Sequence, residues 1–523
     1  MLNISDQDVR EKVLHSDGNI IVSASAGTGK THTIIEKIEY DILKIKSFQT
    51  YAVITFTRKA TNEISNRLRN NKINGFVGTN DNFILTEIIR PFMYTAYGKD
   101  FKKEIKPDYS NDNALEDFEE GLEIIKSDGV ICKYKTNRSC KNRKRNFGFQ
   151  LALEILKKSH IARRYMKAKY FRIYIDEYQD SDRDMHNLFK YLYNNLKIPL
   201  FIVGDIKQSI YGWRGGYPDG FIELMKNKDF NTFTLYHNFR SNISIQNYSN
   251  IFMNDARENF KLNNLEKEVI GFRYPAENSC EAIVEYVKQW INVDESCAFL
   301  VRRNDKAEKI SNLFKSKNLD FEYIPGSPLD NADMESEHIW IARSLANYIW
   351  NSRYSEYNFF NEIPMPESFK VNAINTLLKN INKNIEEKNK FLQQCKKLYY
   401  FLGYDDDLKI EKEVEKLFDV INDKKYSVTY NASKYKHTIN TIHSSKGLQY
   451  EQIIILSDDY KIWSTDDEEN ELHYVAITRP KRKLLILVSD DMYVNHIEKC
   501  VKSITTICKT PVGIEDVILL ENH

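Results

Sequence analysis

The sequence has little of what marks a membrane protein or a disulfide-bonded one. Its seven cysteines are scattered through 523 residues without a C-x-x-C pair, which favours reduced thiols in a cytoplasmic protein and argues against a zinc or iron–sulfur site. The longest apolar runs, such as Leu484–Val488, are far shorter than the ~18 residues of a membrane-spanning helix. The N-terminus is polar and acidic, so we expect neither a secretory signal nor a membrane segment.

The chain also lacks an excess of charge of either sign. Lys and Arg total 75 against 74 Asp and Glu, a formal net charge of +1, which excludes an overall polycation. A local basic groove for nucleic acid remains compatible with this balance, because a folded groove needs only a local lining. Hydrophobic residues make up 42% and charged residues 28%, the profile of a globular protein, and the length predicts roughly three or four domains.

Short runs of β-branched and aromatic residues alternate with helical patterns along the chain. This alternation predicts an α/β fold with parallel sheets, which bind ligands at the carboxyl ends of their strands. The predicted strands are Asn19–Ser23, Tyr51–Phe56, Phe171–Ile175, Leu200–Val203, Ala298–Val301, Ile453–Leu456 and Leu484–Val488. Residues 90–170 and 326–434 break this rhythm and are predicted to be helical insertions. In the second, an amphipathic helix is predicted from the spacing of Ile374, Leu377, Leu378, Ile381 and Ile385.

A glycine-bearing loop follows the first predicted strand and precedes a helical pattern. Such a loop turns successive backbone N–H groups toward an anion, and the helix N-terminus adds partial positive charge. We expect Lys30 to reach the β- and γ-phosphates of a nucleotide and Thr31 to hold Mg²⁺. A glycine-rich turn without a ligand is the alternative. The predicted phosphate loop comprises Ala24, Ser25, Ala26, Gly27, Thr28, Gly29, Lys30 and Thr31, with Ala24 at the usual first glycine.

Two further predicted strands end in polar residues suited to the same chemistry. After Phe171–Ile175, we assign Asp176 to the metal and Glu177 to the attacking water; a solvated acidic turn is the alternative. After Leu200–Val203, Gln208 is placed to sense the γ-phosphate. Five and six residues further on, Trp213 and Arg214 suit stacking on a base and pairing with a phosphate, although such a Trp is as often part of the core.

The ordered set of motifs resembles a UvrD/Rep-type superfamily 1A DNA helicase. The resemblance spans residues 7 to 480 and leaves out only the insertions and a short tail. It implies two RecA-like P-loop domains that bind ATP and Mg²⁺, each with a helical insertion, the second one reduced. The motif segments are Thr55–Ile64, Gly78–Phe83, Asp176–Asp180, Gly204–Gly216, His237–Ser241, Phe299–Asn304, Thr441–Leu448 and Tyr474–Arg479.

The resemblance also implies domain boundaries. The first RecA-like domain, 1A, is expected at 1–89 and 171–236, with insertion 1B at 90–170. The second, 2A, is expected at 237–325 and 435–523, with a reduced 2B-like insertion at 326–434. A basic tract at 133–145 within the first insertion is read either as a DNA contact or as a solvated loop.

By motif position, several more residues are assigned to the nucleotide. Arg240 and Arg479 match arginine fingers, which neutralise charge on the transferred phosphoryl group. Phe239 takes the position that stacks on adenine, and Gln7 the position that reads it. His32, which stands where the family commonly has an arginine beside adenine, and Gly447 complete the predicted nucleotide site.

The family's DNA track maps onto aromatic, polar and basic residues, any of which has an ordinary structural role as its alternative. Aromatic side chains in such a track stack on bases, and cations hold the backbone. The predicted DNA-binding residues are Phe56, Thr57, Arg58, Thr79, Asn82, Phe83, Trp213, Arg214, His443 and Ser445.

These features predict a DNA-stimulated ATPase that acts on single-stranded or tailed DNA, and the family resemblance implies that it moves 3′→5′. A compact chain of this kind resembles the helicase subunit of Gabija-type bacterial anti-phage systems, which implies a separate nuclease partner of the OLD/Toprim type. The alternative function is an ATP-driven sensor of DNA ends that regulates the nuclease and unwinds little. An inactive ATPase scaffold is disfavoured because the predicted catalytic residues are all present.

Overall fold

The computed structural model of the protein divides into two compact units. The first comprises Met1–Ile105, Ser110–Ala276 and Lys446–His523, and the second Lys106–Tyr109 and Glu277–Ser445. Within the part of the chain that is described, no helix is both long and apolar enough to cross a membrane. The described residues are 6–46, 48–56, 58–68, 75–102, 105–107, 114–135, 145–212, 215–261, 267–274, 279–330, 337–363, 371–404, 407–463, 467–508 and 510–522.

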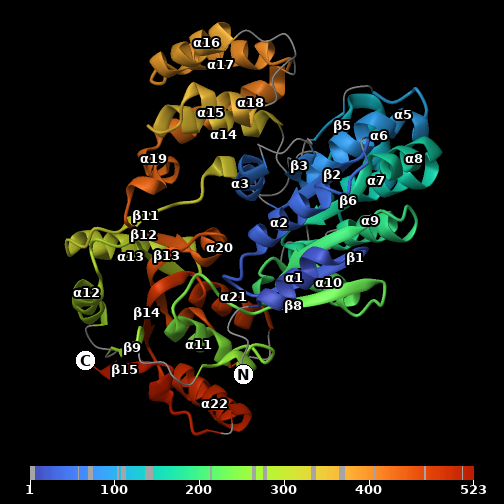
Figure 1. The fold of residues 1–523 in the computed structure, drawn as a ribbon. Helices are drawn as coiled ribbons and strands as arrows, with labels where there is room; N and C mark the ends of the chain where they lie inside the picture. Colours follow the sequence, from blue (N-terminus) through green and yellow to red (C-terminus); the bar gives the residue numbers. More distant parts are fainter. Residues whose placement is uncertain are drawn as a thin grey trace. The chain divides into compact units, whose positions relative to one another are not determined.

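A six-stranded parallel sheet lies in the first unit (Figure 1). Its order, β3-β2-β6-β7-β1-β8, puts β6, β7 and β1 in the interior, so their carboxyl ends meet at one edge. The predicted strands in this region are confirmed to within one residue at each end. The strands are β1 Asn19–Ala24, β2 Thr50–Thr55, β3 Phe76–Thr79, β6 Tyr170–Ile175, β7 Leu200–Gly204 and β8 Phe230–Leu235.

Helices follow these strands and carry the residues that approach the sheet edge. Helix α1 (Gln7–His15) packs on α2 (Lys30–Ile42) and against β8. The other helices near this sheet are α3 Arg58–Leu68, α4 Asn80–Ile84, α9 Arg183–Asn194 and α10 Pro218–Met225. The described residues between 85 and 170 are mainly helical, with a π-helix at Leu85–Ile89, α5 Arg90–Tyr97, α6 Phe118–Asp128, α7 Phe147–Lys158 and α8 His160–Lys169, and a short ladder of β4 Lys106–Pro107 and β5 Val130–Ile131.

A second sheet has seven strands in the order β11-β12-β10-β13-β14-β9-β15. The runs predicted at Ala298–Val301, Ile453–Leu456 and Leu484–Val488 are confirmed as β10, β13 and β14. The strands are β9 Val269–Arg273, β10 Cys297–Val301, β11 Glu322–Tyr323, β12 His437–Thr441, β13 Tyr450–Leu456, β14 Pro480–Val488 and β15 Leu519–Asn522. The helices of this part are α11 Ile243–Ile251, α12 Ser279–Trp290, α13 Asn304–Ser316, α20 Ile442–Ser445, α21 Asp467–Ile477 and α22 Asp491–Cys508.

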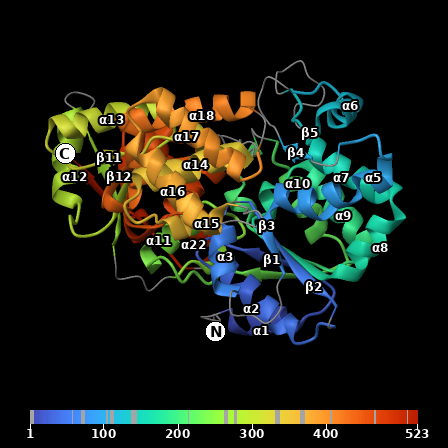
Figure 2. The ribbon, with the colours of Figure 1, turned by 90° about the horizontal axis from the view of Figure 1, so that it is seen from above.

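The second unit contains a helical cluster with its own apolar core. Helices α14, α16, α17 and α18 lie side by side in it (Figure 2). The predicted amphipathic helix is present as α16, whose Ile374, Leu378 and Ile381 are fully buried, and Leu377 packs at the margin of the core. The cluster comprises α14 Glu337–Trp350, α15 Glu356–Glu362, α16 Val371–Lys383, α17 Lys388–Phe401, α18 Asp407–Asn422 and α19 Lys424–Tyr430.

A buried charge network holds α2 behind the phosphate loop. The Lys37 ammonium donates to Asp41 Oδ1 at 2.9 Å and, at 2.8 Å each, to the backbone carbonyls of Leu14 in the last turn of α1 and of Ser16 just after it. On the other side, Asp41 Oδ2 pairs with Arg172 Nε at 2.9 Å and accepts a hydrogen bond from the Tyr174 hydroxyl at 2.7 Å. Burial lowers the pKa of Lys37 and raises that of Tyr174. Asp41 is therefore the carboxylate that two buried cations share.

Replacing that carboxylate should destabilise the first unit strongly. We expect Asp41→Ala to lower its free energy of unfolding by about 3–5 kcal/mol, because Lys37 and Arg172 would stay buried without a counter-charge. The matched control is Asp17→Ala, which removes an exposed carboxylate paired with Lys44 at 3.0 Å and should cost at most about 1 kcal/mol. Urea denaturation followed by circular dichroism measures both, and equal losses would contradict a central role for Asp41.

Candidate active site

The predicted phosphate loop connects β1 directly to the first turn of α2. Gly27 and Gly29 have φ values of 76° and 81°, the left-handed region that glycine adopts without strain. Thr28 is fully buried, and its hydroxyl donates to the Ser25 carbonyl at 2.8 Å, which closes the loop internally. Helix α2 begins at Lys30, so the loop and the helix N-terminus form the anion-binding arrangement that the sequence predicts.

The two predicted acids stand at the end of β6. Asp176 is 3% exposed, and Glu177 has a φ of 50°, a strained value for a residue with a side chain. Glu177 is held there by two contacts: its N–H donates to Asp176 Oδ1 at 2.9 Å, and Gln179 Nε2 donates to its Oε2 at 2.5 Å. Glu177 Oε1 lies 3.4 Å from Lys30 Nζ, so the phosphate-loop lysine meets the predicted base.

The surroundings of Asp176 and Glu177 shift the pKa values of the two carboxyl groups in opposite directions. Burial and the neighbouring charge of Glu177 raise the pKa of Asp176 to about 7. Burial also acts against ionised Glu177, but the ammonium groups of Lys30 and Lys446 outweigh it and lower the pKa of Glu177 to about 2. Glu177 is thus an ionised carboxylate suited to accept a hydrogen bond from water and orient it, whereas a nearby cation would favour the ionised form of Asp176. With the Thr31 hydroxyl, Asp176 supplies the oxygen donors that Mg²⁺ prefers.

Two arginines lie near Glu177 with little compensating charge. Arg479 is 2% exposed, and its Nε donates to the Val475 carbonyl at 2.9 Å. Arg240 Nη1 donates to the Thr478 carbonyl at 3.1 Å, and its Nε is buried without a hydrogen-bond partner among the described residues. Burial and the charge of Arg240 lower the pKa of Arg479 to about 9. In the described part of the chain, neither arginine forms an ion pair with a carboxylate. A bound phosphate would therefore give both guanidinium groups a counter-charge.

Gln208 connects these groups to the end of β7. Its Nε2 donates to Asp205 Oδ2 at 2.6 Å, and its Oε1 accepts from Arg479 Nη2 at 3.1 Å. Both Gln208 and Asp205 are buried. The amide therefore links the sheet edge to the guanidinium, which is the arrangement expected of a residue that responds to the γ-phosphate.

Asn238, which the sequence analysis did not single out, packs the arginine segment onto the phosphate loop. Its Oδ1 accepts from the backbone N–H groups of Arg240 and Ser241 at 2.7 and 3.1 Å, and the Phe239 N–H donates to the Gly27 carbonyl at 3.0 Å. A Cβ at Gly27 would lie 2.1 Å from Asn238 Oδ1. The position of Asn238 immediately before the Phe–Arg pair is the signal that could have identified it.

Lys446 is a second residue that the sequence analysis missed, although it lies in the segment Thr441–Leu448. Its ammonium donates to Asp180 Oδ2 at 2.6 Å and to the Gln208 carbonyl at 2.8 Å, and it lies 4.7 Å from the Tyr211 ring centroid. Burial raises the pKa of Asp180 to about 6 despite this contact. Lys446 thus adds a cation beside Glu177.

The remaining predicted nucleotide residues lie around the loop with different degrees of exposure. Phe239 is 63% exposed, and Gln7 is exposed at the start of α1. The His32 imidazole is 60% exposed and lies 3.2 Å from Glu36 on the next turn of α2. Gly447 occupies a turn with a φ of 81°.

The predicted DNA-binding residues divide into buried and accessible ones. Phe83 is fully buried, with ring centroids 5.4 Å from Phe76 and 6.0 Å from Tyr170, which favours the core alternative for this residue. Ser445 is also buried, and its hydroxyl donates to the Ile442 carbonyl at 2.7 Å.

The other described members of this set keep some exposure. Phe56 and His443 are partly buried, and the Thr79 hydroxyl caps α4 by accepting from the Asn82 N–H at 3.4 Å. Thr57, Trp213, Arg214 and the Arg58 side chain lie outside the described residues, as does most of the basic tract. At the end of that tract, Arg145 pairs with Asp184 at 2.8 Å.

Comparisons with known proteins match the chain to two helicase family models and to related proteins. The family described as "UvrD/REP helicase N-terminal domain" matches residues 5–98 and 98–230, and "UvrD-like helicase C-terminal domain" matches residues 356–491. The chain is 39% identical to "Gabija protein GajB" of Bacillus cereus (strain VD045) over 503 residues, which cover 95% of this chain and 98% of that protein. It is 24% identical to "Probable DNA helicase II homolog" of Mycoplasma capricolum over 93% of this chain and 84% of that protein. It is also 24% identical to "ATP-dependent DNA helicase PcrA" of Staphylococcus aureus over 66% of this chain and 54% of that protein.

The contact between Gly27 and Asn238 gives a direct test of the site. We expect Gly27→Ala to lower ATP turnover by about 100-fold, because the new Cβ displaces the segment that carries Arg240. Gly18→Ala is the matched control, since Gly18 has the same φ of 76° but nothing within 4 Å of a Cβ. It should lose about 1 kcal/mol of stability and keep its turnover within about twofold. Steady-state ATPase and thermal melting measure both, and equal turnover in the two variants would contradict the packing argument.

Proposed function

Because the chain belongs to the UvrD/Rep family of ATP-hydrolysing DNA helicases, we propose that it is an Mg-ATP-dependent translocase that DNA stimulates and that moves 3′→5′. The observation that carries this proposal is the meeting of four groups at one phosphate loop: Lys30, Glu177, Arg240 and Arg479. A nucleoside triphosphate has the clustered negative charge and the flat base that such a set, with Phe239 beside it, would match.

The side chains divide the work of hydrolysis. Bound Mg-ATP supplies the γ-phosphoryl group and its negative charge. Lys30, Arg240 and Arg479 stabilise the charge that develops on the transferred group. Glu177 orients water and accepts its proton, and its strained backbone and the hydrogen bond from Gln179 fix the direction of the carboxylate.

Gln208 makes the position of Arg479 depend on the end of β7. The Gln208 amide is hydrogen-bonded to both Asp205 and Arg479. A displacement of one of these partners therefore moves the amide and shifts the other partner. We propose that DNA binding acts on turnover through this link, because the segment that contains Gln208 continues to the predicted base-stacking residues Trp213 and Arg214. This supports a translocase in which hydrolysis and DNA contact are coupled.

The arginine at the centre of the site provides the test of the chemistry. We expect Arg479→Met to lower DNA-stimulated ATP turnover by about 10³-fold, because the developing phosphoryl charge loses its buried partner. The melting temperature without nucleotide should stay equal or rise, since a desolvated cation with no carboxylate partner is removed.

Lys190→Met is the control, because it removes an exposed cation paired with Glu223 in the same unit and should change neither quantity measurably. Steady-state ATPase on single-stranded DNA and differential scanning calorimetry give the two readouts. If folded Arg479→Met hydrolyses ATP within tenfold of the rate of the native protein, Arg479 does not stabilise the charge on the transferred phosphoryl group.

We propose in addition that the translocase acts with a nuclease of the OLD/Toprim type in bacterial anti-phage defence. The support is the alignment with a Gabija protein over nearly the full length of both chains. The second candidate, an ATP-driven sensor of DNA ends that regulates the nuclease, is favoured by the compact helical cluster at 337–430, which stands where the family resemblance puts a larger insertion.

Unwinding separates the two candidates. For a translocase we expect the isolated chain to displace the labelled strand of a duplex with a 3′ single-stranded tail and not of one with a 5′ tail. A sensor would hydrolyse ATP in response to DNA ends without displacing the strand. Gel-based strand displacement and ATPase on linear and closed circular DNA provide the measurements, with Lys30→Ala as the inactive control. Adding the nuclease then tests whether its cleavage depends on ATP turnover by this chain.

A further inference from the structure

We propose that a buried hydrogen-bonded chain fixes the two arginines of the active site, Arg240 and Arg479, relative to each other. The members of this tyrosine–histidine chain are Tyr248, Tyr493 and His473, which lie outside the motif segments. Because all three side chains are fully buried, their role is to position the arginines and not to contact the nucleotide. The inference rests on the proposed function, since it takes both arginines to stabilise the transferred phosphoryl group.

Each of the two arginines is attached to one end of a helix. Arg240 lies three residues before the start of α11 at Ile243, and Arg479 lies two residues after the end of α21 at Ile477. Thr478 joins them, because its carbonyl accepts from Arg240 Nη1 at 3.1 Å and its hydroxyl oxygen accepts from Arg479 Nη2 at 3.2 Å. The relative position of the two guanidinium groups therefore follows the relative position of α11 and α21.

The tyrosine–histidine chain connects α11 to α21 through α22. The Tyr248 hydroxyl on α11 lies 2.7 Å from the Tyr493 hydroxyl on α22, which lies 2.6 Å from Nε2 of His473 on α21. The His473 ring also packs edge to face on both tyrosine rings, with centroids 5.6 Å from Tyr493 and 6.5 Å from Tyr248. Because a hydrogen bond weakens steeply when it is stretched or bent, a shift of one helix against another would break the chain.

The burial of His473 makes a break in the chain costly. Burial lowers the pKa of His473 to about 3, so the imidazole is neutral. Its Nδ1 is buried and has no hydrogen-bond partner among the described residues, which leaves the Tyr493 hydroxyl as the polar contact of this ring. A buried polar group that loses its partner keeps the full desolvation penalty. The native arrangement of the three helices is therefore favoured over shifted ones.

A second attachment joins the arginine segments at the start of β14. The Ser241 hydroxyl donates to the Pro480 carbonyl at 2.7 Å, and the Asn242 N–H donates to the Lys481 carbonyl at 2.9 Å. This attachment alone would let α11 and α21 pivot about one point. The tyrosine–histidine chain holds the same two helices at a second point, and two points of attachment fix the angle between the helices.

The first measurement separates positioning from nucleotide binding. We expect Tyr493→Phe, which removes only the central hydroxyl, to lower kcat for DNA-stimulated ATP hydrolysis about tenfold, because displaced arginines stabilise the transition state poorly. The KM for ATP should change less than twofold. His473→Leu should behave in the same way, whereas His473→Gln, whose amide can still bond to the Tyr493 hydroxyl, should recover most of kcat.

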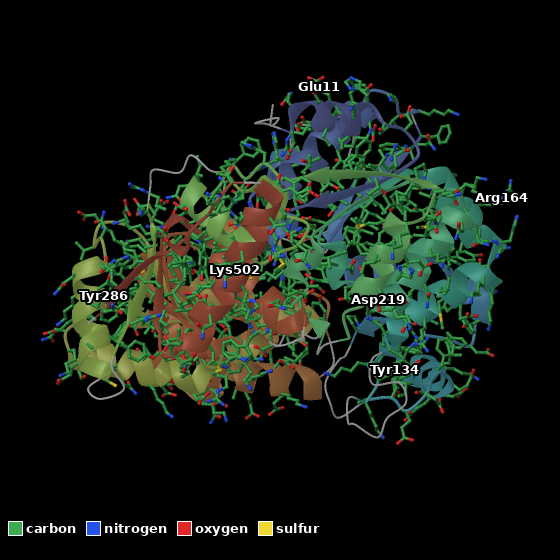
Figure 3. All side chains as sticks on the ribbon, turned by 90° about the horizontal axis from the view of Figure 1, so that it is seen from below. Glu11, Tyr134, Arg164, Asp219, Tyr286 and Lys502 are labelled. Atoms are coloured by element: carbon green, nitrogen blue, oxygen red, sulfur yellow. The ribbon has the colours of Figure 1, made fainter. Side chains whose placement is uncertain are left out.

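Two controls separate a loss of stability from a loss of positioning. Tyr430→Phe removes a buried hydroxyl that lies 2.7 Å from the Ser327 hydroxyl in the second unit. It should lower the melting temperature as Tyr493→Phe does, yet keep kcat within about twofold. Lys502→Met changes an exposed side chain of α22 (Figure 3) and should alter neither quantity.

A double-mutant cycle tests whether the chain acts through Arg479. In an Arg479→Met background, measured with protein in excess over ATP, Tyr493→Phe should lower turnover at most about threefold further, because only Arg240 is left to be displaced. A tenfold loss in both backgrounds would mean that the chain supports the fold without positioning Arg479. That result would overturn the inference, as would an unchanged kcat or an equal change in kcat and KM in Tyr493→Phe.

Hydrogen–deuterium exchange of the nucleotide-free protein gives a readout that does not depend on hydrolysis. The amides of residues 238–242 and 474–479 should exchange about tenfold faster in Tyr493→Phe than in the native protein and should be unchanged in Tyr430→Phe. Unchanged exchange in Tyr493→Phe would overturn the inference. Absence of ATP hydrolysis by the native protein would instead count against the proposed function, while the exchange result still decides whether the chain holds the two segments.

Discussion

A concentration of buried positive charge is the constraint on which the rest of the active site depends. Arg479 is almost fully desolvated, and the charge of Arg240 nearby helps to lower its pKa to about 9. Glu177 is the carboxylate that meets Lys30, and it also attracts Lys446 and both arginines, so one carboxylate faces four cations. Such a site is unfavourable without a ligand, since desolvation of a cation exceeds what distant opposite charges return. Binding of a polyanion such as a triphosphate would reduce that penalty by supplying counter-charge.

The cations keep their positions because two segments far apart in the sequence are in contact at Gly27. The absence of a side chain there admits Asn238, and Asn238 in turn fixes the backbone of the segment that carries Phe239 and Arg240. Behind the loop, the shared carboxylate of Asp41 holds α2 in place. The chemistry of the loop therefore depends on packing that a substitution several residues away can disturb.

Most of the fold could be predicted from the sequence, because buried parallel strands have a distinct composition and the phosphate loop has a distinct spacing. The catalytic candidates were predicted for the same reason: Asp176 and Gln208 follow strands whose carboxyl ends meet. Residues such as Asn238 and Lys446 were missed, since their roles arise from contacts between segments remote in sequence. Phe83 illustrates the opposite difficulty, because motif position does not reveal whether an aromatic ring faces solvent or packs between Phe76 and Tyr170.

Lys446 shows how such remote contacts can control the chemistry. Its ammonium is one of the charges that lower the pKa of Glu177, and it is held by Asp180 and by the Gln208 carbonyl. The same residue follows His443 by three positions, in a segment that the sequence assigns to DNA. The pKa of Glu177 therefore depends on a cation that lies three residues from the predicted DNA contact His443 in the sequence. Because electrostatic interactions are strong in a desolvated site, a displacement of this ammonium away from Glu177 would raise the pKa of that carboxyl group.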